Sequence, residues 1–315
     1  MNKLLLIALG GLLAQLVDGS LGMGFGATSS TLLLALAAMN PASASAVVHV
    51  AELGTTLASG VSHWRFNNID WKVVLRLGLP GAVGAFAGAT LLSNLSLATA
   101  KPVMATILTL IGINLVLRFS TGRRTARGTG APATPRTLSF LGLFGGFVDA
   151  AGGGGWGPVT SSTLMSIGKT EPRRIVGTVN TAEFLVTLAA SLGFVLGMWQ
   201  ELTEHLLPVL ALLAGGVLAA PFAAWLVTRI NPTALGGFVG TCLVVTHLPY
   251  LIGLAPALAP YSLPLILATA LTGLVLSVRG VLRSRQLTPR RPTGYQETVP
   301  PSIHPLATST TRTKD

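Results

Sequence analysis

The chain has 315 residues and a formal net charge of +11; 50% of its residues are hydrophobic and only 10% are charged. Soluble domains carry about 25% charged residues, so this composition excludes a water-soluble globular protein. The basic residues flank apolar runs, and no basic domain or aromatic platform accompanies them, so we expect no nucleic-acid partner. The single cysteine, Cys242, excludes a disulfide framework.

The first predicted elements are two short apolar segments, 4–17 and 26–39, on either side of the glycine-rich stretch 18–26. As helices, such segments are about 16 to 21 Å long, less than a hydrocarbon core of about 30 Å. We therefore predict a helical hairpin whose break lies at membrane depth, where irregular backbone must be buried in protein or line a cavity. Two tilted full spans with the break at the surface remain the alternative.

The following elements repeat this order. A second hairpin, 138–148 with 158–168, is broken at 149–158. The predicted spans are 47–62, 73–92 and 103–119 in the first half, 175–199, 206–227 and 235–252 in the second half, and 263–278 at the end. We predict a first transmembrane repeat at 1–120, a basic cytoplasmic linker at 121–136, a second transmembrane repeat at 137–254, an extra C-terminal span at 255–283 and a disordered cytoplasmic tail at 284–315.

An internal repeat relates the two halves at an offset of 131 residues, from Asp18 to Asp149. Glu52 and Glu183 match at the same offset, and chance agreement of so many special residues is improbable. The matching motifs are Val17-Asp18 with Gly22, Gly24 and Gly26, and Val148-Asp149 with Gly153, Gly155 and Gly157.

Basic residues cluster in alternate connections, and cytoplasmic connections carry the excess of Lys and Arg. This rule makes the C-terminus cytoplasmic and makes corresponding segments run in opposite directions, as in many secondary transporters. We therefore predict an all-α polytopic membrane protein of two inverted-topology repeats. Each repeat is a broken glycine-rich hairpin plus three spans, and one extra span follows. Lys3 and Lys101 are exceptions to the charge rule.

The glycine-rich breaks are candidate anion sites. Glycine allows successive N–H groups to turn toward one point, and the N-terminus of the next helix adds further donors. The alternative is that these glycines only allow close helix packing. Almost no Lys or Arg lies inside the spans, so backbone donors, hydroxyls and a few polar side chains must hold the negative charge. The candidate substrate-binding residues are Gly22, Gly24, Gly26, Ser29, Ser30, Gly153, Gly154, Gly155, Trp156, Ser161, Ser162, His49 and Asn180.

Carboxylates near the breaks are candidate coupling residues. Asp18 and Asp149 stand at the breaks, where an Asp either caps the following helix or binds a proton during transport. Glu52 and Glu183 lie in apolar spans, where an ionisable residue needs a partner or a function. The alternative for these two is a structural hydrogen bond that holds the hairpin to the neighbouring helix.

Polar residues form a stripe on the span that carries each glutamate, and we expect these stripes to be two walls of one polar cavity. His49 is matched by Asn180, so we do not expect a symmetric metal site. The stripes are Ser45, His49, Glu52 and Thr56 in the first half, and Asn180, Glu183, Thr187 and Ser191 in the second.

The glycine-rich motifs resemble those of the TauE/SafE sulfite exporter family, also called the toluene sulfonate uptake permease family. The similar segments are 147–158, 16–26 and 81–88, within a resemblance over about residues 4 to 280. The resemblance implies an inner-membrane permease for small sulfur-containing or organic anions. The first motif departs from the usual Gly-Gly-Gly form, because Met23 and Phe25 stand between its glycines.

Together these features predict a secondary transporter for a small anion, such as sulfite, a sulfonate or a related organosulfur or carboxylate anion. It would work by alternating access and be driven by an ion gradient. A passive anion channel is the alternative, and an intramembrane enzyme is less favoured because no catalytic motif is recognised. We expect no catalytic residue, metal or cofactor, and the lipid bilayer and a small anionic solute as partners. These features are compatible with import or export and with a homo-oligomer.

Overall fold

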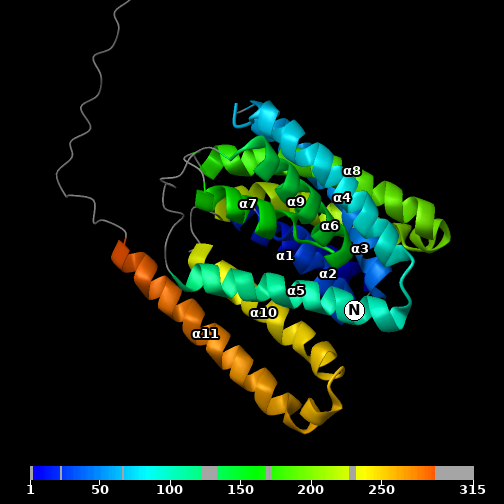
Figure 1. Ribbon diagram of the computed structural model, residues 1–315, viewed down its shortest axis with the longest axis vertical. Helices are drawn as coiled ribbons and strands as arrows, with labels where there is room; N and C mark the ends of the chain where they lie inside the picture. Colours follow the sequence, from blue (N-terminus) through cyan, green and yellow to red (C-terminus); the bar gives the residue numbers. More distant parts are fainter. Residues whose placement is uncertain are drawn as a thin grey trace, which may run out of the picture.

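The computed structural model describes residues 3–21, 23–65, 67–121, 133–167, 170, 172–226 and 232–287, and these residues form helices and their connections without a strand (Figure 1). The first half contains α1 (Lys3–Leu21), α2 (Phe25–Leu36), α3 (Pro41–Arg65), α4 (Trp71–Ser93) and α5 (Leu97–Ser120). The second half contains α6 (Pro135–Gly152), α7 (Trp156–Ile167), α8 (Pro172–Glu204), α9 (Leu206–Leu226) and α10 (Pro232–Ile252). A short 3₁₀ helix, η1 (Pro256–Tyr261), then leads into α11 (Ser262–Leu287).

Five helical segments in the described part of the chain are long and apolar enough to cross a membrane: Trp71–Ser93, Leu97–Ser120, Arg174–Glu204, Thr233–Ile252 and Pro256–Gln286. Helix α3, which we predicted as a span from 47 to 62, is not among them. The physical reason is its stripe of buried polar residues, which lowers the hydropathy of a helix that packs inside the protein.

The first arms of the hairpins are longer than predicted. Helix α1 has 19 residues and α6 has 18, which correspond to about 28 and 27 Å. Only α2 and α7, with 12 residues each, are short. The apolar runs end at Asp18 and Asp149, but both helices continue beyond these residues. Helix α6 stops where Gly153 adopts a positive φ of 69°.

Two predicted boundaries also change. Helix α11 continues to Leu287, so residues 284–287 are helical and do not belong to a disordered tail. Helix α6 begins at Pro135, inside the predicted linker. The central part of that linker, 122–132, and the tail from 288 onward lie outside the described residues.

Helices of each half pack mainly against helices of the other half, an arrangement that we call the exchange of helix partners. Helix α1 of the first half lies along α9 of the second, and α6 of the second half lies along α4 of the first. Helices α3 and α8 pack on each other, as do α5 and α10. A Cβ atom on Gly112 of α5 would lie 2.7 Å from the carbonyl oxygen of Gly240 of α10, and a Cβ atom on Gly240 would lie 2.7 Å from that of Gly112. Glycine is therefore needed on both sides of this crossing.

Helix α11 stands apart from this exchange. It packs along α10 and α5 at the edge of the bundle (Figure 1). Many of its large apolar side chains are exposed, including Leu263, Leu267 and Leu271. Lipid is the solvent that such a surface requires.

Candidate functional site

The breaks of the two hairpins touch through their backbones. A Cβ atom on Gly26, at the start of α2, would lie 2.8 Å from the Cα atom of Gly154. A Cβ atom on Gly154 would in turn overlap the backbone of Gly26 and Ala27. Gly154 also has a φ of +135°, which L side chains rarely adopt. We call this approach of Gly26 and Gly154 the tip contact.

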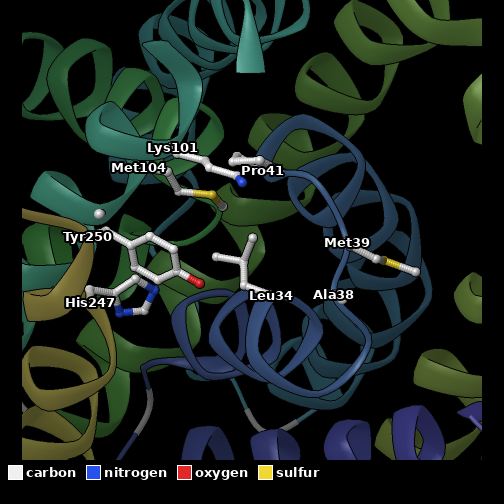
Figure 2. Close-up of a pocket in the computed structure, with 9 residues that line it drawn as sticks. Leu34, Ala38, Met39, Pro41, Lys101, Met104, His247 and Tyr250 are labelled. Carbon is white, nitrogen blue, oxygen red and sulfur yellow. The ribbon is translucent and has the colours of Figure 1, made fainter. Parts of the chain in front are cut away.

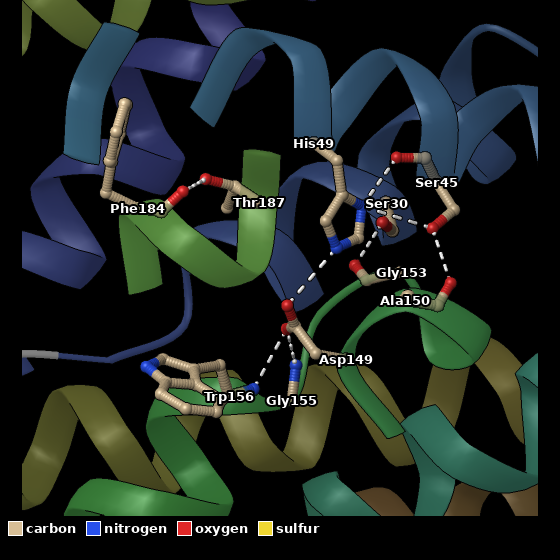
Figure 3. Close-up of polar contacts among 10 residues, drawn as sticks. All are labelled: Ser30, Ser45, His49, Asp149, Ala150, Gly153, Gly155, Trp156, Phe184 and Thr187. Carbon is tan, nitrogen blue, oxygen red and sulfur yellow. Dashed lines mark hydrogen bonds and ion pairs between the residues drawn. The ribbon is translucent and has the colours of Figure 1, made fainter. Parts of the chain in front are cut away.

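Asp149 accepts hydrogen bonds from the backbone N–H groups of the second break. Its carboxylate Oδ1 accepts hydrogen bonds from the N–H groups of Gly155 (2.7 Å) and Trp156 (2.9 Å), as Figure 3 shows. Its backbone carbonyl accepts those of Gly153 and Gly154. Four consecutive N–H groups, which we expected to face an anion, are therefore directed at Asp149. The carboxylate caps α7, so an external anion could use these donors only if Asp149 moved away.

His49 of α3 contacts the second oxygen, Oδ2, of this carboxylate. Its Nε2 lies 3.2 Å from Asp149 Oδ2, and both side chains are buried. Its Nδ1 lies 2.8 Å from the carbonyl oxygen of Ser45, and since a carbonyl only accepts, Nδ1 carries a proton. The contact between Nε2 and Oδ2 then needs one further proton, whichever atom holds it. The intact pair is therefore neutral as a whole, which reduces the cost of burying it.

Ser45 fixes the position of α3 against the break. Its hydroxyl donates a hydrogen bond to the carbonyl oxygen of Ala150 at 2.8 Å. Ser30 of α2 makes a similar bond to the carbonyl oxygen of Gly153. Hydroxyls from two helices of the first half thus hold the second break (Figure 3).

The other candidate carboxylates gather around the tip contact. Glu52 is 3% exposed, and a Cβ atom on Gly26 would lie 3.1 Å from its Oε1. Its Oε2 has no hydrogen-bond partner among the residues that the structure places. Asp18 accepts a hydrogen bond from the N–H of Phe25, as Asp149 does at its own helix. Glu183 is close enough to Glu52, Asp18 and Asp149 to interact with them electrostatically. Within the described residues, no cluster of these side chains has the arrangement of a metal site.

Not every predicted site residue faces the tips. Ser29 lines a small void between α1 and α2, with Ile7 and Gly10 among its neighbours, away from the tip contact. Trp156 is fully buried, and its Nε1 donates to the carbonyl oxygen of Val179 at 3.1 Å, so its ring anchors α7 to α8. Asn180 donates to the hydroxyl of Ser59 across the α3–α8 interface at 3.2 Å.

The remaining candidates are backbone or hydroxyl positions. Gly24 precedes α2 with a φ of 112°, which makes glycine the favoured residue there. Ser161 is fully buried, and its hydroxyl has no partner among the described residues. Gly22 lies outside the described residues.

Arg118 was missed as a site residue, because the sequence groups it with the basic connection that follows. The structure places it in the last turn of α5, where its guanidinium donates to the Ser162 hydroxyl of α7. It also lies 3.7 Å from the sulfur of Met23, which precedes α2. A cation therefore stands between the two hairpins, and the only signal for it in the sequence is its place inside the predicted span 103–119.

Comparison with known proteins shows the family of this chain. The family model for sulfite exporter TauE/SafE matches residues 7–250. The chain belongs to the TauE/SafE family. The resemblance of its glycine-rich motifs is thus confirmed. A TauE/SafE chain with several membrane-spanning helices is a multi-pass membrane transporter.

A curated relative agrees with this assignment. The chain is 45% identical over 249 residues to the probable membrane transporter protein YtnM of Bacillus subtilis (strain 168), and the alignment covers 78% of this chain and 82% of that protein. No solved structure gives a significant match.

Proposed function

We propose that this transporter is a secondary carrier for a small anion of the sulfite or sulfonate class, driven by an ion gradient. The observation that carries the proposal is the tip contact, where two short helices from different halves meet beside buried carboxylates. The family name supports the substrate class, and the chain contains no recognisable ATP-binding motif that would supply another driving force.

The exchange of helix partners supports a two-fold relation between the halves, and the alternating basic connections favour its inverted form. When α1, α3, α4 and α5 are matched to α6, α8, α9 and α10, the α1–α9 and α4–α6 pairs map onto each other, and the α3–α8 and α5–α10 pairs map onto themselves. The extensive α4–α8 contact maps onto the smaller α3–α9 contact. Such a relation between halves allows two conformations of similar energy, one open to each side of the membrane. We infer from the basic connections that the C-terminus is cytoplasmic, and membership of the family supports an inner-membrane location.

Proton binding is the coupling step that the charges favour. A substrate anion at the tips would be repelled by ionised carboxylates at short range. Glu52 is the group best placed to remove this repulsion, because it touches the tip contact and its Oε2 has no partner among the described residues. Glu52 would therefore bind a proton when the anion binds, and it would release this proton after the anion has left. The neutral His49–Asp149 pair can keep the α7 cap in place meanwhile.

The alternative of a passive channel predicts a different dependence on concentration and pH. In this conformation backbone atoms of Gly26 and Gly154 are in contact, an arrangement that fits a closed carrier better than an open pore. A channel would show no saturation at moderate concentration and no response to a pH gradient beyond the membrane potential.

Transport by purified protein in liposomes tests the proposal. The parent should exchange internal for external anion in a panel of sulfite, thiosulfate, sulfoacetate and taurine, and a pH gradient should drive accumulation of the preferred anion. Glu52→Gln should keep exchange but lose this accumulation. Glu204→Gln, at an exposed position on the end of α8, is the matched control and should behave like the parent. Gradient-driven accumulation by Glu52→Gln at the parental level would refute the coupling role.

A further inference from the structure

A cavity of about 150 Å³ opens at the end of the bundle where α2 ends and α5 begins. Its walls include Leu34 of α2, Pro41 of α3, Lys101 and Met104 of α5, and His247 and Tyr250 of α10 (Figure 2). A water molecule occupies about 30 Å³ in the liquid, so this cavity has room for an anion of a few heavy atoms. It is separate from the carboxylates at the tip contact.

The polar groups of the cavity come from two helices. Lys101 supplies an ammonium group from the first turns of α5, and Tyr250 supplies a hydroxyl. The rings of His247 and Tyr250 lie side by side, with centroids 6.4 Å apart. His247 is 1% exposed, and its Nδ1 donates to the carbonyl oxygen of Leu243 at 2.8 Å. Its Nε2 has no partner among the described residues, although a buried polar atom normally has one.

One side chain separates this cavity from the tips. Met104 lines the cavity and is fully buried. Its methyl group also lies against Gly153, because a Cβ atom on that glycine would overlap it. Methionine is unbranched and flexible, so it can change rotamer with little cost. A solute in the cavity would therefore be one side chain away from the second break.

We propose that this cavity is an access subsite for the transported anion, in which Lys101 and Tyr250 donate hydrogen bonds to a small oxyanion before it passes Met104. Because His247 donates through Nδ1, its Nε2 is an acceptor, and it can accept the O–H of a protonated anion such as hydrogensulfite. The inference rests on the proposed function. It also explains why Lys101 departs from the charge rule: the cavity lies on the side that the basic connections predict to be external, where Lys is otherwise scarce. Hydroxyl and ammonium donors match the oxygens of a sulfite or sulfonate group.

Thiol labelling tests the cavity without relying on transport. Cys242 is first replaced by alanine, and Ala38, an exposed residue at the rim of the cavity, is changed to cysteine. Intact cells are treated with an anionic or a cationic methanethiosulfonate reagent. Lys101→Gln should lower the ratio of the anionic to the cationic rate about fivefold, the effect expected of one unit charge near a protein surface. A cysteine at Gln200, exposed and predicted to be external, is the control and should show no change.

Uptake kinetics supply the second readout. With radiolabelled sulfite outside, at a pH where hydrogensulfite is present, Lys101→Gln and His247→Phe should each raise KM about tenfold and leave the maximal rate within about twofold. This is the effect expected when a charged donor to the substrate, or a buried acceptor from it, is lost. Lys72→Gln, at the exposed start of α4, should leave KM unchanged.

The outcomes separate the two proposals. If the parent transports sulfite but neither the labelling ratio nor KM responds to Lys101→Gln, the access subsite is wrong and the proposed function stands. If labelling at position 38 shows the charge effect but the parent transports no anion of the panel, the proposed function fails and the cavity remains an anion site. Failure of position 38 to react in intact cells would overturn the external location.

Discussion

The cap that Asp149 makes on α7 leads to a sharp prediction about stability. Asp149→Ala removes two hydrogen bonds to backbone N–H groups and leaves His49 buried without its partner. Breaking a buried pair by removing one member costs about 3 to 5 kcal/mol. Asp149→Asn has a different expected result. Its amide oxygen can still accept the N–H groups of Gly155 and Trp156, and its amide nitrogen can donate to a neutral His49, so we expect a loss of about 1 to 2 kcal/mol.

Asp70 provides the matched control. It caps α4 by accepting the N–H groups of Lys72 (3.1 Å) and Val73 (3.3 Å), but its side chain is 39% exposed. Water can replace such a cap, so Asp70→Ala should cost only about 1 kcal/mol. Reversible unfolding of the purified proteins in mixed micelles, followed by tryptophan fluorescence, measures all three variants against the parent. Equal losses for Asp149→Ala and Asp70→Ala would refute the claim that Asp149 holds a buried network.

The further predictions concern packing, topology and the tips. A Cβ atom on Gly11 would overlap the carbonyl oxygen of Leu212, whereas one on Gly10 would meet its nearest neighbour at 3.4 Å. Gly11→Ala should therefore destabilise the protein by about 1 to 3 kcal/mol in the same unfolding assay, and Gly10→Ala by less; equal effects would contradict the close α1–α9 contact. In a chain without Cys242, a cysteine at Gln200 should react with an impermeant thiol reagent in intact cells, and one at Asn67 should not; reaction at both would argue against the inverted repeat. Gly154→Ala should reduce transport to background while the protein still inserts and purifies as a single species, because its Cβ atom pushes the tips apart; normal transport would show that the tip contact is dispensable.

Several features of this protein can be predicted from the sequence because they depend only on composition and on the spacing of residues along the chain. The membrane class follows from composition, and the repeat follows from matched spacing of Asp18 and Asp149 with their glycines. The capping alternative for Asp149 also follows from local order, since the Asp and the helix that it caps are only a few residues apart. Such features need no knowledge of which helices become neighbours.

Tertiary structure decided the partners across the bundle. His49 and Asp149 are 100 residues apart, and Arg118 and Ser162 are 44 apart, so only the packing of α3 and α5 against the second break brings them together. The same holds for the cavity that joins Lys101 to His247. The direction of each side chain also separates candidate site residues that are adjacent in the sequence. Ser30 faces the tips, whereas its neighbour Ser29 faces α1. Periodicity places residues on a face of a helix, but only the neighbouring helices determine what that face meets, because each neighbour is itself positioned by contacts from the other half of the chain.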